Sequence, residues 1–154
     1  AELDGAKTVF EEVQKVTRVA AANKSLAEAI QSREIVALHE ALQEGAAAGI
    51  GESDLEKART ILEDETKKMA ARSGLEKATK KRKSTGLRAA IIDGEQAGLT
   101  EEELAPIRIM LAQEEGRKAA RQDIWHACKT CDVEALQKAI AAGETAGLPE
   151  NEPE

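Results

Sequence analysis

A repeat of 49 residues constrains this chain more than any other feature of its sequence. The tripeptide Ala48-Gly49-Ile50 returns as Ala97-Gly98-Leu99 and again as Ala146-Gly147-Leu148, with no gap between copies. Such a chain is expected to stack copies of one supersecondary unit. The same offset aligns further apolar and glycine positions: Leu26, Leu75 and Ile124; Ala29, Ala78 and Ala127; Leu38, Leu87 and Leu136; Ala41, Ala90 and Ala139; Leu42, Ile91 and Ile140; Gly45, Gly94 and Gly143.

The composition predicts that each unit is helical. Aromatic residues are 1% of the chain, namely Phe10 and Trp125, while alanine is abundant. Alanine has the highest intrinsic helix propensity, and strands favour the β-branched and aromatic runs that are scarce here. We therefore expect an all-α protein.

The repeat also predicts where helices begin and end. Each copy contains the segment L-x-x-A-[LI], which places apolar side chains on one stripe of a helix. Glycine follows each of these segments, at a position where a left-handed C-terminal cap requires no Cβ. Ser53 and Thr100 each fit the start of a capping box. The predicted short helices cover 33–47, 85–97 and 133–146, and the predicted long helices cover 4–31, 53–82 and 101–130.

Two details of the long helices are expected from spacing. A break near Gly74 or Asp123 is the alternative to continuous second and third long helices, because Ser73 and Glu76 offer a new N-terminal cap. In the first long helix, the predicted packing seam consists of Val9, Val13, Val16, Ala20, Ala27 and Ile30.

Short connections make neighbouring helices antiparallel. We predict about six helices in antiparallel hairpins, forming either a solenoid-like array or an elongated bundle. The array is predicted to be one domain over 1–148, with repeat units at about 1–50, 51–99 and 100–148. The acidic, proline-rich segment 149–154 is predicted to be disordered. The last short helix is expected to have an open side that the first helix or another protein covers.

The pattern L-x-x-A-I-x-x-G-x-x-A-G-L, here Leu87 to Leu99, is followed by Leu104 and Leu111. It resembles helical-hairpin repeats found in many algal and protist proteins, often attached to unrelated domains. The resemblance covers most of the chain and implies a structural repeat rather than an activity. It further implies a photosynthetic or related protist as the source, and a peripheral subunit of a large plastid assembly such as a photosystem, after removal of a targeting sequence. Otherwise a cytoplasmic location is expected.

The charge balance bears on the class of partner. The formal net charge is −7 and the pI is about 5.1, whereas nucleic-acid binding depends largely on a basic surface. No apolar run reaches the roughly 18–20 residues that cross a bilayer. We therefore expect a soluble protein whose partners are other protein subunits, with no nucleic acid, no transmembrane segment and at most a peripheral association with a membrane complex.

The strongest chemical candidate is the segment that contains His126, Cys128 and Cys131. A Cys-x-x-Cys pair can act in redox exchange, and these three side chains are weak candidates for a metal site. A small redox or metal-binding protein is therefore the alternative function. The repeat favours an ordinary helix joint, because Cys128 takes the position of Ile30 and Thr79, and Cys131 that of Arg33 and Arg82. A disulfide between the two cysteines also stays open.

Two further features are candidates for binding a partner protein. Trp125 replaces the Glu76 of the preceding copy, which predicts an outward-facing position where tryptophan anchors an interface. A basic cluster could dock an acidic protein face, anionic lipid or RNA, or could simply be a solvated helix end. This cluster contains Lys77, Lys80, Lys81, Arg82 and Lys83.

Signatures of catalysis are missing from the sequence. It contains no glycine-rich phosphate loop, no G-x-S-x-G, no H-E-x-x-H and no calcium loop. We therefore expect a non-enzymatic structural or adaptor subunit without a cofactor, which binds other proteins through its helix faces.

Overall fold

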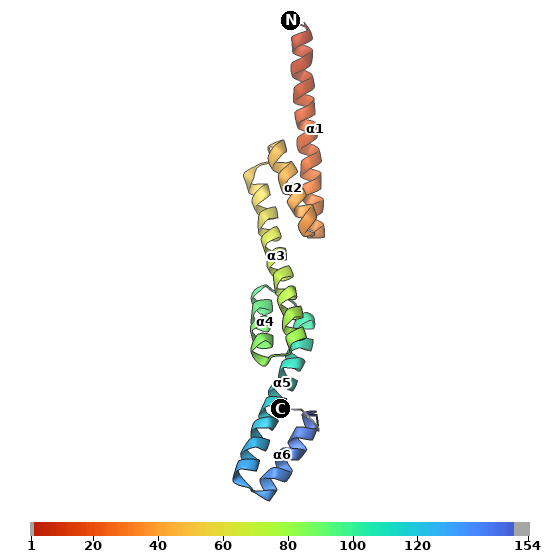
Figure 1. Cartoon of the computed structure of the whole chain (residues 1–154). Helices are drawn as coiled ribbons and strands as arrows, with labels where there is room; N and C mark the ends of the chain where they lie inside the picture. Colours follow the sequence, from red (N-terminus) through yellow and green to blue (C-terminus); the bar gives the residue numbers. More distant parts are fainter. Residues whose placement is uncertain (1, 150–154) are drawn as a thin grey trace. The chain divides into compact units, whose positions relative to one another are not determined.

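The computed structural model describes residues 2–149 and contains six α-helices and no strand among them (Figure 1). This confirms the predicted all-α fold with consecutive antiparallel helix pairs. The disorder predicted for the acidic tail falls, after Pro149, outside the described residues. The helices are α1 (Glu2–Ser32), α2 (Ile35–Ala48), α3 (Glu52–Lys81), α4 (Ser84–Gln96), α5 (Glu101–Thr130) and α6 (Val133–Thr145).

The helix ends lie within two residues of the predicted ones. Helices α3 and α5 both run unbroken, so the alternative of a break near Gly74 or Asp123 is wrong. In α3 the buried residues Ala71, Leu75 and Ala78 are four and three positions apart. They reach one core only if the helical period continues through Gly74, and this packing outweighs the local capping signal.

Glycine ends each short helix as the repeat predicts. Gly49, Gly98 and Gly147 have φ values of 82°, 74° and 68°. The following residue turns back, and the N–H of Ile50 donates to the carbonyl of Gly45 at 2.9 Å. Leu99 and Leu148 make the same bond at 2.9 Å to the glycine five positions earlier, which is the Schellman arrangement.

Of the two capping boxes predicted at helix N-termini, one is present and one is not. The box at Thr100 is confirmed, because its side chain and that of Glu103 each bond the other residue's backbone. The box at Ser53 is wrong. Helix α3 begins at Glu52, and the N–H groups of Asp54 and Leu55 donate to the carbonyl of Gly51 at 3.0 and 3.3 Å. Ser53 therefore lies inside the first turn, where it cannot cap the helix.

The turns from long to short helices have a backbone feature that the sequence analysis did not predict. Arg33, Arg82 and Cys131 adopt left-handed φ values of 58°, 50° and 55°. Each long helix is thus followed by a non-glycine residue in a backbone conformation that usually costs about 1–2 kcal/mol. Sequence reasoning missed these positions because glycine is the ordinary signal for such a turn.

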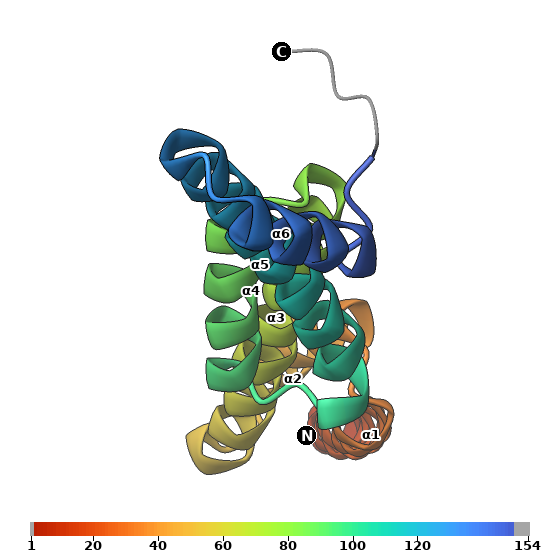
Figure 2. The ribbon, with the colours of Figure 1, turned by 90° about the horizontal axis from the view of Figure 1, so that it is seen from below.

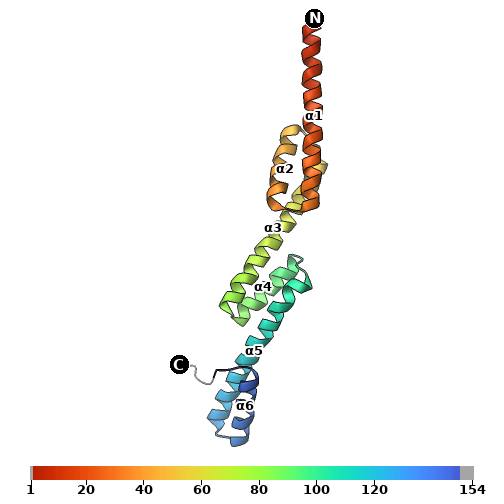
Figure 3. The same cartoon turned by 90° about the vertical axis from the view of Figure 1, so that its right-hand side faces the viewer.

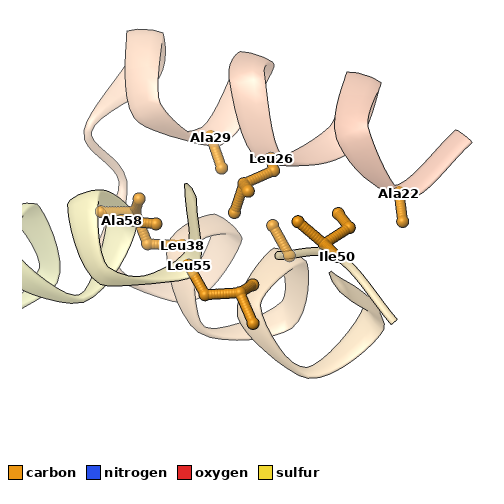
Figure 4. Packing of buried hydrophobic residues seen from close by; sticks show 8 residues of the cluster. Ala22, Leu26, Ala29, Leu38, Ile50, Leu55 and Ala58 are labelled. Atoms are coloured by element: carbon orange, nitrogen blue, oxygen red, sulfur yellow. The ribbon is translucent and has the colours of Figure 1, made fainter. Parts of the chain in front are cut away.

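The chain divides into two compact units, Ala1–Met69 and Ala70–Glu154. In the first unit α2 packs antiparallel to the C-terminal half of α1, and the start of α3 completes a three-helix cluster (Figures 3 and 4). This first cluster has a small core of alanine, leucine and isoleucine. Its buried residues are Ala22, Leu26, Ala29, Leu38, Ala41, Ile50, Leu55 and Ala58.

The predicted seam of α1 is wrong in the C-terminal half of the helix. The buried stripe there consists of Ala22, Leu26 and Ala29, whereas Ala20 and Ala27 are exposed. Ile30 is partly buried against the first cluster. The repeat register, which aligns Leu26 and Ala29 with later copies, identified the packed face better than the run of apolar spacings did.

The second unit contains a second three-helix cluster, made by the end of α3, all of α4 and the start of α5. Its buried residues are Ala71, Leu75, Ala78, Leu87, Ala90, Leu99 and Leu104. The C-terminal half of α5 then pairs with α6 in what we term the terminal hairpin (Figure 2). Among the described residues, no helix has the length and apolar character that a bilayer crossing requires.

Candidate protein-docking surface

The N-terminal half of α1 displays a row of large apolar side chains. Val9, Val13 and Val16 lie four and three residues apart, so they share one face of the helix. Leu3 and Phe10 add two further apolar side chains to the same half-helix, and each of the five is more than half exposed. A contiguous apolar surface of this kind is typical of a binding site.

The repeat identifies which face of α1 this is. Val9 stands in the register of Ala58 and Ile107, and Val13 in that of Leu62 and Leu111. Those residues pack against the first and second clusters, where each belongs to the third helix. The α1 stripe, defined as Ala6, Val9, Val13 and Val16, therefore has the pattern of a third helix, yet its side chains are exposed.

The terminal hairpin shows the opposite situation. Leu87 of the second cluster is fully buried, and Ile91, also on α4, is 5% exposed. Their counterparts Leu136 and Ile140 are partly buried and 52% exposed, because no third helix packs on this side among the described residues of the second unit. We term this side the open face and define it by Ile124, Cys128, Cys131, Leu136 and Ile140.

Ion pairs fasten the third helix to the preceding turn in both complete clusters. The Arg33 guanidinium lies 3.3 Å from the Glu65 carboxylate, and that of Arg82 lies 3.2 Å from Glu114. In the second cluster Arg88 also pairs with Glu115. Both glutamates at the turn are partly buried, so these contacts set the register of the third helix as well as adding a little stability.

A further contact joins α3 to the start of α5. The Nε of Arg72 donates to the Glu103 carboxylate at 2.7 Å, and the Thr100 N–H donates to the same side chain at 3.1 Å. The Arg72 hydrogen bond and then that of the Thr100 backbone lower the pKa of Glu103 from its ordinary value. The carboxylate form thus favours the docked start of α5.

The basic cluster at the end of α3 is exposed throughout but is partly neutralised by neighbouring carboxylates. Lys80 lies 2.6 Å from Glu76, and this hydrogen bond lowers the pKa of the Glu76 carboxyl. Arg82 is engaged with Glu114 as described above. Lys77, Lys81 and Lys83 form no ion pair among the described residues, so three of the five cations face solvent.

Trp125 is 59% exposed on α5, as its alignment with Glu76 predicted. The ring of His126 meets it edge-on at 4.9 Å between centroids. The Nζ of Lys129 lies 4.9 Å from the indole centroid, a cation–π contact one helical turn away. These contacts preorder the indole at the surface, and its role as an interface anchor stays a prediction.

Both cysteines are exposed thiols. Cys131 caps α5, and its Sγ lies 3.5 Å from the carbonyl oxygen of Cys128. Asp132 caps α6 by accepting from the N–H groups of Glu134 and Ala135. No three histidine, cysteine or acidic side chains gather as a metal site among residues 2–149, so the structure does not bring the sequence candidates His126, Cys128 and Cys131 together as ligands.

The sequence reasoning did not foresee the exposed stripe of α1, which it interpreted as an internal seam. The signal was available in the repeat register, since Val9 and Val13 occupy third-helix positions. Comparisons with protein-family models, curated proteins and solved structures found no match for this chain. The functional interpretation therefore depends on these surfaces.

Proposed function

We propose that this chain is a non-enzymatic binding subunit that docks onto protein partners through its helix faces. The observation that carries the proposal is the α1 stripe together with the neighbouring Leu3 and Phe10. An amphipathic helix that lays apolar residues into a groove is a recurrent mode of protein recognition, with anchors spaced three and four residues apart.

Magnitudes support α1 as the primary anchor. Full burial of one large aliphatic side chain is worth roughly 1.5–3 kcal/mol, and Val9, Val13 and Val16 are each more than half exposed before binding. Exposed ion pairs contribute about 0–1 kcal/mol each, so the charged surface adds register more than affinity. Apolar contact on α1 is therefore expected to dominate the binding energy.

Trp125 and the basic cluster supply secondary contacts in this proposal. An exposed, preordered indole suits the centre of a small interface, and the free cations Lys77, Lys81 and Lys83 suit an acidic protein surface. The likeness of the repeat to helical hairpins of algal and protist proteins supports a place as a peripheral subunit of a large plastid assembly. The resemblance proposes only the cellular setting, whereas the proposed binding surface is inferred from the exposed side chains.

Site-specific photocrosslinking in the source cells tests the proposal. A photoreactive residue replaces Val9 or Val13 on the stripe. Val36 of α2 provides the matched control because it is a valine of the same unit that is even more exposed than these two. We expect a defined protein adduct from both stripe positions and none from Val36. Equal, diffuse labelling from all three positions would contradict the proposal.

A further inference from the structure

The α1 stripe and the open face of the terminal hairpin are complementary parts of one three-helix cluster. We infer that the N-terminal half of α1 of one copy docks as the third helix on the terminal hairpin of a second copy. This inference rests on the proposed function and names its partner, a second copy of the same chain. The arrangement repeats the two clusters that the chain already forms within itself.

The apolar positions fit residue by residue. In the docked arrangement Val9 takes the place of Ala58 and Ile107, and Val13 that of Leu62 and Leu111. These contacts would cover Leu136 and Ile140, whose counterparts on α4, Leu87 and Ile91, are buried. The half-exposed apolar side chains of the open face therefore receive the same kind of cover as in the second cluster.

The polar positions provide the stronger argument, because they change together. The turn residues Arg33 and Arg82 each pair with a glutamate of the third helix, Glu65 and Glu114. At the terminal turn the arginine is replaced by Cys131, which leaves no cation to receive a glutamate. The α1 stripe has Val16 at the glutamate position, so an apolar pair replaces the ion pair on both sides.

A second pair of positions changes in the same way. Arg88 of α4 pairs with Glu115 of α5 in the second cluster. The corresponding residues of α6 and α1 are Gln137 and Thr17, both of which are neutral and able to hydrogen bond. Charge is thus lost from both members of each pair relative to the second cluster. The second pair distinguishes α1 only from the start of α5 as the occupant, because α3 has Thr66 at the position of Thr17.

Two positions depart from the pattern, and the first is Ala6, which stands where the complete clusters have the buried Leu55 and Leu104. Glu12 stands where the complete clusters have Ile61 and Met110. Both of those side chains are only partly buried, so this position lies at the margin of the third helix. A carboxylate there reaches water without being enclosed, and the apolar centre formed by Val9, Val13 and Val16 is kept.

The inferred contact joins two different surfaces and is therefore heterologous. Each chain offers one α1 stripe and one open face, so it can bind two neighbours. Such contacts close into a ring or continue as a chain of subunits, according to the rotation between copies. Several copies of such a subunit would then form a row along a larger assembly.

Sedimentation of the 154-residue chain over a range of concentrations provides the first test. We expect concentration-dependent association that Val13→Glu or Ile140→Glu weakens at least about tenfold, because each places a charge in the apolar contact. The matched controls are Val36→Glu and Ile92→Glu, at exposed positions of α2 and α4. The controls are expected to associate like the unaltered chain, with all variants equally helical.

Mixing the two stripe and face variants tests the head-to-tail geometry. A Val13→Glu chain keeps an intact open face, and an Ile140→Glu chain keeps an intact α1 stripe. Their mixture is expected to form a dimer that grows no further, at concentrations where each variant alone stays monomeric. A mixture that stays monomeric would overturn the inference, since the contact would not then join these two surfaces.

Transplanting the ion pair gives the sharpest test. Val16→Glu alone and Cys131→Arg alone are each expected to weaken association, because each leaves one charge unmatched. The double variant restores the pair found at Arg33–Glu65 and Arg82–Glu114 and is expected to recover association. Failure of the double variant to recover, with its helicity intact, would overturn the assigned register.

These outcomes separate the inference from the proposed function. A chain that sediments as a monomer at every concentration, while Val9 and Val13 crosslink to a different protein, would overturn the inference and leave the docking function standing. Absence of any defined adduct from the stripe would remove both. Adducts between Val13 and residues of α6 from a second copy would support both.

Discussion

The second cluster and the terminal hairpin share a sequence pattern and differ in burial. Leu87 is fully buried and Ile91 is 5% exposed, whereas the aligned Leu136 is partly buried and Ile140 is 52% exposed. The difference arises because the start of α5 covers α4, and no such helix covers α6 among the described residues of the second unit. In a repeat array, burial is thus decided by the neighbouring copy rather than by the pattern itself.

The first cluster supports this interpretation independently. Leu38 of α2 is fully buried, like Leu87 of α4, and both short helices are covered by the start of the next long helix. Both clusters also fasten that helix with an arginine–glutamate pair at the left-handed turn. Complete clusters therefore resemble each other more closely than either resembles the terminal hairpin.

The largest expected effect is the difference in the free energy of unfolding between alanine variants of Leu87 and Leu136. Leu87→Ala removes a fully buried side chain and is expected to lower the free energy of unfolding by about 2–5 kcal/mol. Leu136→Ala is expected to cost roughly 1–2 kcal/mol, because the side chain is already partly hydrated. Urea unfolding of the dilute, monomeric chain measures both values.

Leu38→Ala is the control for this comparison and is expected to behave like Leu87→Ala. Equal losses at Leu87 and Leu136 would mean that the open face is covered in the monomer, and the contrast in burial would have no energetic consequence.

The next effect concerns glycines inside the short helices. A Cβ at Gly94 would lie 2.8 Å from the Leu104 Cδ2, and Leu104 is almost fully buried. A Cβ at Gly143 would lie 3.2 Å from the Ile124 Cδ1 and 3.3 Å from the Leu148 Cδ1, and both side chains are partly exposed and able to yield. Gly94→Ala is therefore expected to destabilise by about 1–3 kcal/mol through overpacking.

Gly143→Ala is expected to change stability by less than about 1 kcal/mol, because alanine's better helix propensity offsets the milder contact. Thermal unfolding of the two variants, measured side by side, tests this difference. A stabilised Gly94→Ala chain would show that Leu104 moves aside freely and that the second cluster is less tightly packed than the terminal hairpin.

The repeat made most of the fold predictable. Helix ends followed from glycine caps such as Gly98, whose conformation depends on local steric limits that the residue type reveals directly. The outward position of Trp125 followed from its alignment with Glu76. Properties that depend on the neighbouring copy were harder to foresee. The exposed stripe of α1 and the ion pair between Arg82 and Glu114 require knowing which helix packs where.

A smaller effect distinguishes the left-handed turns. Cys131→Gly relieves a non-glycine left-handed conformation and is expected to stabilise the chain by about 1 kcal/mol. Arg82→Gly relieves the same conformation but loses the pair with Glu114, so its net effect is expected to lie near zero. Urea unfolding under reducing conditions compares them, and a larger gain at Arg82 than at Cys131 would show that the ion pair adds nothing.

The smallest effect is expected at Glu103, whose contact with Arg72 lies within the second cluster. Its pKa is lowered in the folded chain by Arg72 and by the Thr100 backbone. A depressed carboxyl pKa stabilises the fold above the ordinary pKa of the unfolded chain, and this contribution is lost as pH falls through the folded pKa. Glu103→Gln should therefore be less stable than the parent near pH 7, and this difference in stability should disappear in acid.

Unfolding midpoints of the Glu103→Gln chain and its parent at pH 7 and at about pH 3 measure this difference. Glu102→Gln, one residue away on the exposed side of α5, is the control. A gap that persists unchanged in acid would assign the loss to side-chain packing instead of the carboxylate charge.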